Sequence, residues 1–409
     1  MSGGESTTPI LTATVLPPQS AESSRTMAMA RASRSRGAWG EGAMTQGSVH
    51  SVVVRLGIIG FPGSGKTTLF NLLTGAEAGV DQPPGRGRLN VGVVRVPDDR
   101  VTRLSALFQP KKTVYATVDV VDLAGFDRGE RATLDVGDLR QADALLHVVR
   151  AFPSPSLGAA PQPAREVQAL EEELVLADLE VLERRLSKLG PGLKRKPTDA
   201  EQREYALLGR VKGPLEEGVS LRAQEMTAEE TRLVRGFQFL SLKPILHCLN
   251  LAEDAVAARE KALAELAEAG KRPGTLVGWV SAAVEAEVAA LPPDEQRSFL
   301  DALGLPEPAL HRVIRDAYTL LGLASFFTVG EDEVRAWTIP AGAAAVEAAG
   351  VIHSDIARGF IRAEVIGWSE LLESGSLAEA RKRALLRLEG KDYPVQDGEV
   401  CHFRFNVGR

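Results

Sequence analysis

Cysteine is scarce, long apolar runs are missing, and positive charge is not in excess. The chain of 409 residues holds two cysteines, Cys248 and Cys401, both inside apolar, strand-like runs. Two such residues do not make a disulfide framework, and a reducing, cytoplasmic compartment is expected. No run reaches the roughly 18 apolar residues of a membrane-spanning helix, so no membrane partner is expected. The formal net charge of −6 argues against a generally basic nucleic-acid binder, and no DNA contact is expected.

The length and the first 50 residues set the domain plan. A chain of 409 residues is too long for one hydrophobic core and predicts two or three domains. Residues 1–50 are rich in Ser, Thr, Ala, Gly and Arg without apolar periodicity, which predicts a disordered N-terminal extension. Their arginines resemble those of an organelle transit peptide. An over-long start assignment, with the true start near Met44, explains the segment equally well.

A phosphate loop organises the rest of the chain. Residues 60–68 read Gly-Phe-Pro-Gly-Ser-Gly-Lys-Thr-Thr, a complete G-x-x-x-x-G-K-[ST] pattern between a strand predicted over 52–59 and a helix predicted over 68–74. The glycines let backbone N–H groups curl around an anion, and the helix directs its positive end at the phosphates. A chance glycine turn is the alternative, but the pattern-conforming neighbours favour a nucleoside triphosphate site. The predicted nucleotide-binding residues here are Gly60, Gly63, Ser64, Gly65, Lys66, Thr67 and Thr68.

The same motifs predict catalytic groups and a magnesium site. Lys66 is expected to reach the β- and γ-phosphates, and the Thr67 hydroxyl to coordinate Mg²⁺. A strand predicted over 114–122 ends in Asp122-Leu-Ala-Gly125, the D-x-x-G pattern that follows a central strand in P-loop GTPases. There the Asp holds Mg²⁺ through water and the Gly amide senses the γ-phosphate. We therefore predict Lys66, Asp122 and Gly125 as catalytic residues, with Thr67 and Asp122 holding the metal.

A later strand predicts the contacts to the base. The strand over 244–249 ends in Asn250-Leu-Ala-Glu253, where GTPases carry N-K-x-D. The longer carboxylate of Glu253 is not placed for the paired hydrogen bonds to guanine, and losing such bonds costs a few kcal/mol. Adenine is therefore the better prediction, with ATP as substrate and GTP less favoured. The base-side residues are predicted to be Asn250, Leu251, Glu253 and, after a strand over 275–280, Ser281.

Residues 165–236 change to a helical composition. Apolar residues spaced by three and four predict an amphipathic helix that breaks at Gly190-Pro191-Gly192. A second helix is predicted over 199–218, and a third over 228–239, with Thr227 as its cap. Basic residues cluster near the tip of this hairpin, either as a solvated helix end or as an RNA-facing surface. The cluster is Arg184, Arg185, Lys188, Lys194, Arg195 and Lys196.

The order of elements predicts the fold class. Strands that alternate with helices indicate a doubly wound α/β sheet, and short strands and turns from residue 326 indicate a compact α+β module. We predict a nucleotide-binding domain over 51–164 and 237–323, an inserted helical hairpin over 165–236, and a C-terminal module over 324–408. A monomer is expected, since no long exposed heptad is left without an internal partner.

A set of motifs spread over about residues 54–408 points to one family. They are 60–68, 91–98, Pro110-Lys-Lys, 122–125, 147–150, 174–186, 250–253, 335–340, 349–355, 359–366, 387–393 and 405–407. Together they resemble the YchF subfamily of the Obg-like P-loop NTPases, the ribosome-binding ATPases. The resemblance implies a G domain, an inserted coiled coil and a ubiquitin-like TGS domain. It also implies slow Mg²⁺-dependent hydrolysis of ATP rather than GTP, and association with the ribosome through its large subunit and rRNA.

The sequence departs from this family in both switch regions. Arg86 stands where the first switch normally carries a Thr that completes the Mg²⁺ shell, and the second switch, 125–143, is shorter than in relatives. Phe126 follows the D-x-x-G motif, where Ras-type enzymes place a water-orienting Gln. Arg86 or Arg88 is a candidate for neutralising phosphate charge. The alternatives are thus a slow ATPase, a non-hydrolysing ribosomal adaptor whose nucleotide is structural, and a true GTPase.

Overall fold

The computed structural model describes residues 54–75, 90–122, 136–155, 158–193 and 197–406. Among the predicted features, the N-terminal extension, Arg86, Arg88, Gly125, Phe126 and the basic residues 194–196 lie outside the described residues. Within the described ranges, no helix is both long and apolar enough to cross a membrane.

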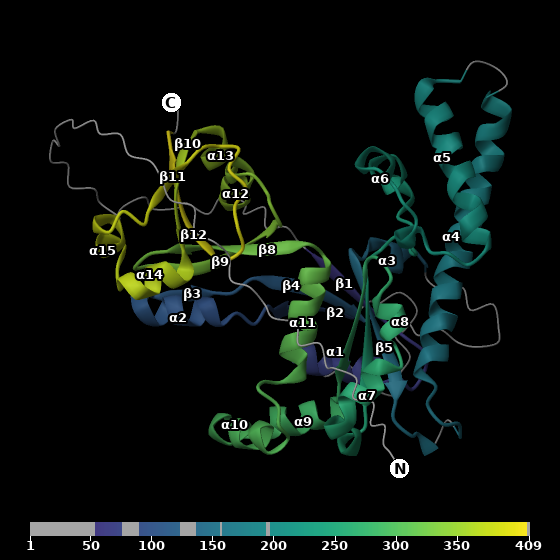
Figure 1. Cartoon of the computed structure of the whole chain (residues 1–409), viewed down its shortest axis with the longest axis horizontal. Coiled ribbons are helices and arrows are strands. Elements are labelled where there is room, and N and C mark those ends of the chain that lie inside the picture. The colour runs from purple at the N-terminus through teal and green to yellow at the C-terminus, as the bar shows by residue number, and fades with distance from the viewer. Residues whose placement is uncertain (1–53, 76–89, 123–135, 156–157, 194–196, 407–409) are drawn as a thin grey trace, which may run out of the picture. The chain divides into compact units, whose positions relative to one another are not determined.

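The first sheet confirms the predicted doubly wound arrangement (Figure 1). Its strand order is β2-β4-β1-β5-β6-β7. All neighbours run parallel except β2, which is antiparallel to β4. The strands are β1 (Arg55–Ile59), β2 (Asn90–Arg95), β4 (Thr117–Asp122), β5 (Ala144–Ala151), β6 (Ile245–Leu251) and β7 (Thr275–Val280).

Both faces of this sheet are covered, as continuous apolar strands require. Ile58 packs with Leu69 of α1 (Lys66–Thr74) and Val313 of α11 (Ala309–Leu320). The next residue along β1, Ile59, joins a separate cluster with Leu170 of α4 (Pro163–Leu193). Further helices follow the strands: α3 (Val136–Gln141), α7 (Arg259–Ala264), α8 (Ala267–Gly270), α9 (Ala282–Ala290) and α10 (Pro293–Ala302).

The inserted segment forms a helical hairpin with its own core. Helices α4 and α5 (Asp199–Glu216) lie side by side (Figure 1), and their shared cluster includes Leu182, Leu207 and Val211. The predicted break at Gly190 is wrong, because α4 runs through Pro191 to Leu193. A proline this close to the end of a helix removes little of its hydrogen bonding, so the last turn persists.

Capping residues define where the next helices begin. Thr227 caps α6 (Ala228–Val234), as the sequence predicts, and it forms a capping box with Glu230. Thr198 and Glu201 form the same arrangement at the start of α5. Helix α6 is shorter than predicted and passes into a 3₁₀ turn, η3 (Arg235–Phe237); another such turn, η2 (Leu221–Ala223), precedes it.

A second sheet forms the C-terminal α+β module, in the order β11-β10-β12-β8-β9-β3. Its helices are α12 (Ala345–Ile352), α13 (Ser354–Arg358), α14 (Trp368–Ser374) and α15 (Leu377–Lys382). The strands are β3 (Lys112–Val114), β8 (Leu323–Val329), β9 (Glu333–Pro340), β10 (Phe360–Gly367), β11 (Arg387–Glu389) and β12 (Glu399–Phe405).

Strand β3 ties this module to the nucleotide-binding part of the chain. The single strand predicted over 114–122 is wrong: β3 pairs in parallel with β9 of the second sheet, whereas β4 belongs to the first. The chain passes from the second sheet to the first between Val114 and Thr117. In this link the carbonyl of Ala116 accepts a hydrogen bond from the amide of Val96. On α2 (Asp99–Phe108), Arg100 bonds Asp98 and reaches Asp397 of the module at 2.6 Å.

Candidate nucleotide site

The phosphate loop joins β1 to α1 at the carboxyl edge of the first sheet. Its three glycines all have positive φ, +152° at Gly60, +75° at Gly63 and +94° at Gly65, a conformation that residues with a Cβ rarely adopt. A Cβ at Gly60 would lie 2.5 Å from the carbonyl oxygen of Val148, and one at Gly65 would lie 2.4 Å from the amide nitrogen of Asn250. Only glycine fits these positions, which leaves a backbone cradle at the start of α1.

Lys66 is folded back onto the loop. It is only 8% exposed, and its Nζ donates to the carbonyl of Phe61 at 3.1 Å. Burial lowers the pKa of Lys66, while the nearby Asp122 charge opposes this shift. A buried ammonium with one neutral partner gains most from a polyanion placed in the cradle, so Lys66 is suited to bind phosphate.

Thr67 and Asp122 meet at the end of β4. The Thr67 hydroxyl donates to Oδ2 of Asp122 at 3.4 Å, and Asp122 is 4% exposed. Burial raises the pKa of Asp122 despite the opposing effects of Lys66, Thr67 and Asn90. A buried carboxylate beside a hydroxyl is a hard oxygen donor set of the kind Mg²⁺ prefers, and a cation there would relieve the cost of burial. The residues present therefore fit the ion.

Ser64 and Thr68 complete the predicted phosphate-side residues. Ser64 is buried, and within the described part of the chain its Oγ has no hydrogen-bond partner. An orphaned buried hydroxyl in the cradle is a polar atom that a ligand could satisfy. Thr68 is half-buried in the first turn of α1, and Gly63 is exposed at the loop's turn. All seven predicted phosphate-side residues thus lie in the loop and the first turn of α1.

Asn250 braces the loop. Its Nδ2 donates to the carbonyl of Ser64 at 3.0 Å, and its Oδ1 accepts the amide of Ala282 at 3.0 Å. Ser281 is buried and caps α9 through Val284, and Leu251 is buried at the end of β6. Asn250 therefore ties the loop to the turn that begins α9, a role that the sequence pattern alone did not indicate.

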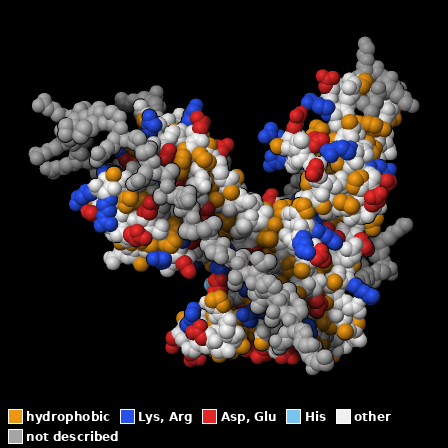
Figure 2. Space-filling view, viewed as in Figure 1, with side chains coloured by type: hydrophobic (Ala, Val, Ile, Leu, Met, Phe, Trp, Pro, Cys, Tyr) orange, Lys and Arg blue, Asp and Glu red, His pale blue; other side chains and the backbone are white. Residues whose placement is uncertain are grey.

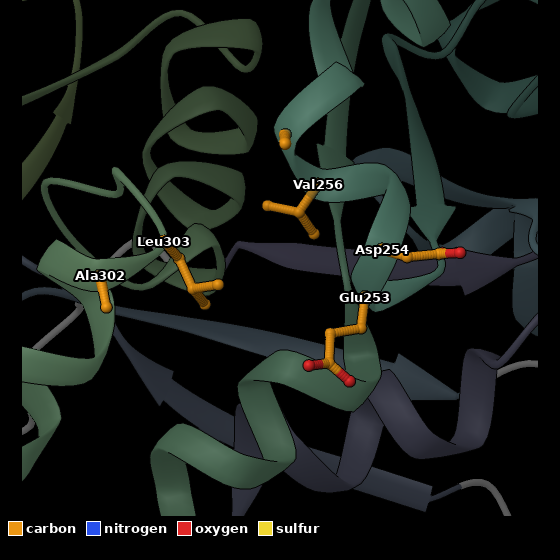
Figure 3. A pocket seen from close by; sticks show the side chains of 6 residues that line it. Glu253, Asp254, Val256, Ala302 and Leu303 are labelled. Carbon is orange, nitrogen blue, oxygen red and sulfur yellow. The ribbon is translucent and has the colours of Figure 1, made fainter.

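Glu253 lies apart from that cluster, on an exposed turn. It begins η4 (Glu253–Ala258) and lines a pocket of about 590 Å³ with Val256, Ala302 and Leu303. Figure 3 shows Val256 and Leu303 facing each other across this pocket, while the Asp254 side chain points away. The carboxylate of Glu253 has solvent access, as a group that meets a bound base would need.

The basic cluster on the hairpin is only partly described. Arg184 and Lys188 are exposed, whereas Arg185 donates two hydrogen bonds to the carboxylate of Glu204 on α5, at 2.6 and 2.8 Å. On the face shown in Figure 2, basic and acidic side chains are interspersed. Of the described members, Arg184 and Lys188 are the two available to an RNA phosphate.

A buried polar network that was not predicted from the sequence lies next to the loop. His147 of β5 and His247 of β6 are register partners, and Glu171 of α4 and Arg222 of η2 extend the contact into the helical insert. Each histidine interrupts an apolar strand, Leu-Leu-His-Val-Val and Ile-Leu-His-Cys-Leu. A polar residue at the third position of each of these two buried strands could have predicted the contact, because buried polar groups need hydrogen-bond partners.

Gly65→Ala should abolish nucleotide binding while the protein stays folded. The added methyl group would displace the Asn250 brace and strain a backbone at φ +94°. Isothermal titration with ATP and Mg²⁺ measures the loss, and circular dichroism reports the fold. Gly75→Ala is the matched control, since Gly75 also has positive φ but faces open space. Full binding by Gly65→Ala would show that the loop needs no glycine there.

The comparisons with known proteins agree with this geometry. A family model described as "YchF-GTPase_C: Protein of unknown function (DUF933)" matches residues 323–406, and one described as "50S ribosome-binding GTPase" matches residues 55–184. The ribosome-binding ATPase YchF of Bacillus subtilis is 42% identical over 363 residues, which cover 86% of this chain and 99% of that protein.

Two further likenesses span the same part of the chain. The ribosome-binding ATPase YchF of Escherichia coli O157:H7 is 39% identical over 364 residues, 86% of this chain and 99% of that protein. The solved structure of the Schizosaccharomyces pombe YchF GTPase superposes with a TM-score of 0.75 at 26% identity, covering 86% and 97% of the two chains. Because the B. subtilis relative is 42% identical over nearly its whole length, and a YchF family model matches the C-terminal module, the chain belongs to the YchF family.

Proposed function

We propose that the protein is a Mg²⁺-dependent ATPase of low turnover that associates with the ribosome and acts in translation or its regulation. The observation that carries the proposal is the meeting of Lys66, Thr67 and Asp122 at the start of α1. The B. subtilis and E. coli relatives are named ribosome-binding ATPases, which supports the choice of reaction and partner.

In this proposal each residue of the loop has a separate task. The backbone from Gly60 to Gly65, with Thr68 behind it, surrounds the phosphates, and Lys66 leaves the Phe61 carbonyl to pair with them. Thr67 and Asp122 hold Mg²⁺, which when bound supplies positive charge against the phosphate oxygens. Gly125, as a γ-phosphate sensor, is part of the proposal and lies outside the described residues.

ATP is proposed over GTP on the basis of Glu253. Asn250 is engaged by Ser64 and Ala282, and Leu251 is buried, so Glu253 is the carboxylate left to meet the base. Its reach differs from that of Asp, which forms the paired hydrogen bonds to guanine in GTPases. The base site then lacks the clamp that rejects adenine.

The protein is proposed to bind the ribosome as a three-domain monomer. We propose a nucleotide-binding domain over 51–164 and 237–323, a helical insert over 165–236 and a TGS domain over 324–408. The large subunit and its rRNA are the proposed partners, with Arg184 and Lys188 among the contacts, and the protein acts as a cytoplasmic monomer. Each phosphate contact should steepen the salt dependence of ribosome binding.

Glu253→Asp should shift the nucleotide preference toward GTP by about tenfold. One regained charge-assisted hydrogen bond is worth about 1.5–3 kcal/mol, and 1.4 kcal/mol is tenfold in affinity. Titration calorimetry with ATP and GTP on wild type and variant gives the ratio. Glu260→Asp is the control, because Glu260 is an exposed glutamate of α7 outside the lining of this pocket. A wild type that prefers GTP would overturn the ATP assignment.

A further inference from the structure

Two histidines are joined by a hydrogen bond in the interior of the first sheet. His147 and His247 are 0% and 1% exposed, and their Nδ1 atoms are 3.0 Å apart. Burial lowers the pKa of both rings, and the His247 and Lys66 neighbours lower that of His147 further. Both rings are therefore neutral at pH 7. A hydrogen bond between two neutral rings needs one donor and one acceptor, so one of the two Nδ1 atoms carries the proton.

Glu171 decides which ring donates. Its Oε1 lies 3.4 Å from Nε2 of His247 and also accepts a hydrogen bond from Arg222. Burial alone would raise the pKa of Glu171, but the His247 hydrogen bond and the charges of Arg222 and Arg272 outweigh it and lower the pKa. An ionised carboxylate only accepts, so His247 must present N–H at Nε2 and a bare Nδ1. His147 is then the donor, as the Nδ1–H tautomer.

The far side of His147 borders the phosphate loop. With its proton on Nδ1, the ring leaves Nε2 as a bare acceptor, and this atom has no hydrogen-bond partner among the described residues. The ring meets that of Phe61 edge-on at 6.5 Å between centroids, and the Phe61 carbonyl is the acceptor that holds Lys66. A continuous set of contacts thus joins Arg222 in the helical insert to the catalytic lysine.

We propose that His147 is a positioning residue of the phosphate loop, held in its Nδ1–H tautomer by His247, Glu171 and Arg222. The inference rests on the proposed nucleotide function and adds to it a link from the insert. If Nε2 carried the proton instead, an N–H would point from His147 without an acceptor, and the contact surface offered to Phe61 would change. The insert therefore fixes the face of His147 against which Phe61 packs. Phe61 in turn places Lys66 through its carbonyl.

The tautomer can be observed directly in the wild-type protein. The chain has six histidines, so ¹⁵N-labelled histidine in the full-length protein gives a countable set of imidazole signals, and loss of one set in His147→Gln assigns that ring. We expect Nδ1–H at His147 and Nε2–H at His247, without nucleotide, at pH 7. A His147 protonated at Nε2, or at both nitrogens, would overturn the proposal. The tautomer is read from the wild-type spectrum, and His147→Gln serves only to assign the signals.

A double variant tests the positioning role. Glu171→Met with Arg222→Met removes the buried pair together and leaves no unpaired charge, a change that folded proteins often tolerate. We expect His147 to lose its tautomer preference, and the dissociation constant of ATP with Mg²⁺ to rise about 5- to 150-fold, the usual range of coupling between sites. The control is Glu183→Met with Lys212→Met, a 2.9 Å ion pair of the insert away from the histidines, and should leave both readouts unchanged.

The outcomes separate this inference from the proposed function. An unchanged ATP affinity in the folded Glu171→Met, Arg222→Met protein, with the tautomer lost, would overturn the positioning role and leave the ATPase proposal standing. A wild type that binds neither ATP nor ADP would overturn the proposed function and the positioning role together.

Discussion

Asp178→Ala should lower the free energy of unfolding by about 3–5 kcal/mol, the usual cost of removing one partner of a buried ion pair. Asp178 on α4 is fully buried and accepts the amides of Leu240 at 2.8 Å and Ser241 at 2.6 Å, together with Arg140 of α3 at 3.2 Å. Alanine would leave two amides and a largely buried guanidinium without their acceptor. Urea unfolding followed by circular dichroism measures the change.

Loss of Asp178 should also weaken the packing of α3 against its neighbouring segments. Arg140 also donates to the carbonyls of Ala177 and Gln238, so the pair fastens α3 both to α4 and to the segment that follows the insert. The control is Glu229→Ala, which removes an exposed ion pair with Arg203 on the same insert and should have little effect on stability. A loss for Asp178→Ala no larger than that of the control would contradict this account.

Lys66→Ala should lower ATP turnover at least about 100-fold. Removing one preorganised donor to developing charge typically costs two to three orders of magnitude in rate, and Lys66 is a full charge held at the loop by Phe61. ATP affinity should fall as well, because the same cation binds the ground-state phosphates. Single-turnover phosphate release separates the two effects, with binding measured by calorimetry.

Lys271→Ala serves as the matched control for Lys66. Lys271 is an exposed lysine paired with Glu268 on the surface, so its removal changes net charge by the same amount without touching the loop. Turnover by Lys66→Ala equal to that of Lys271→Ala would mean that the phosphate loop is not the catalytic centre.

Local motifs made the phosphate loop predictable from sequence. The glycines, Lys66 and Thr67 are contiguous, and their geometry follows from a strand, a turn and a helix in direct succession. Asp122 could be added because it ends the next parallel strand, and carboxyl ends of such strands share one edge. The capping box at Thr227 was likewise readable, because its two partners are three residues apart.

The features that sequence reasoning missed depend on contacts between distant segments. Strand β3 lies beside β9 only because the C-terminal module offers an open edge more than 200 residues later, a pairing that no local pattern encodes. The His147–His247 contact required the register between β5 and β6, and the bracing role of Asn250 required the relative positions of two loops. Pro191 predicts a helix break because the sequence alone does not show that α4 ends two residues later, at Leu193.

The proposed function rests most directly on nucleotide turnover and its response to ribosomes. Steady-state phosphate release from ATP and from GTP should be measured with and without purified ribosomes, with Lys66→Ala as the blank. We expect slow release that favours ATP, rises with ribosomes and is lost in the variant. Tight ATP binding without release in any condition would contradict the ATPase assignment and make the protein a nucleotide-stabilised ribosomal adaptor.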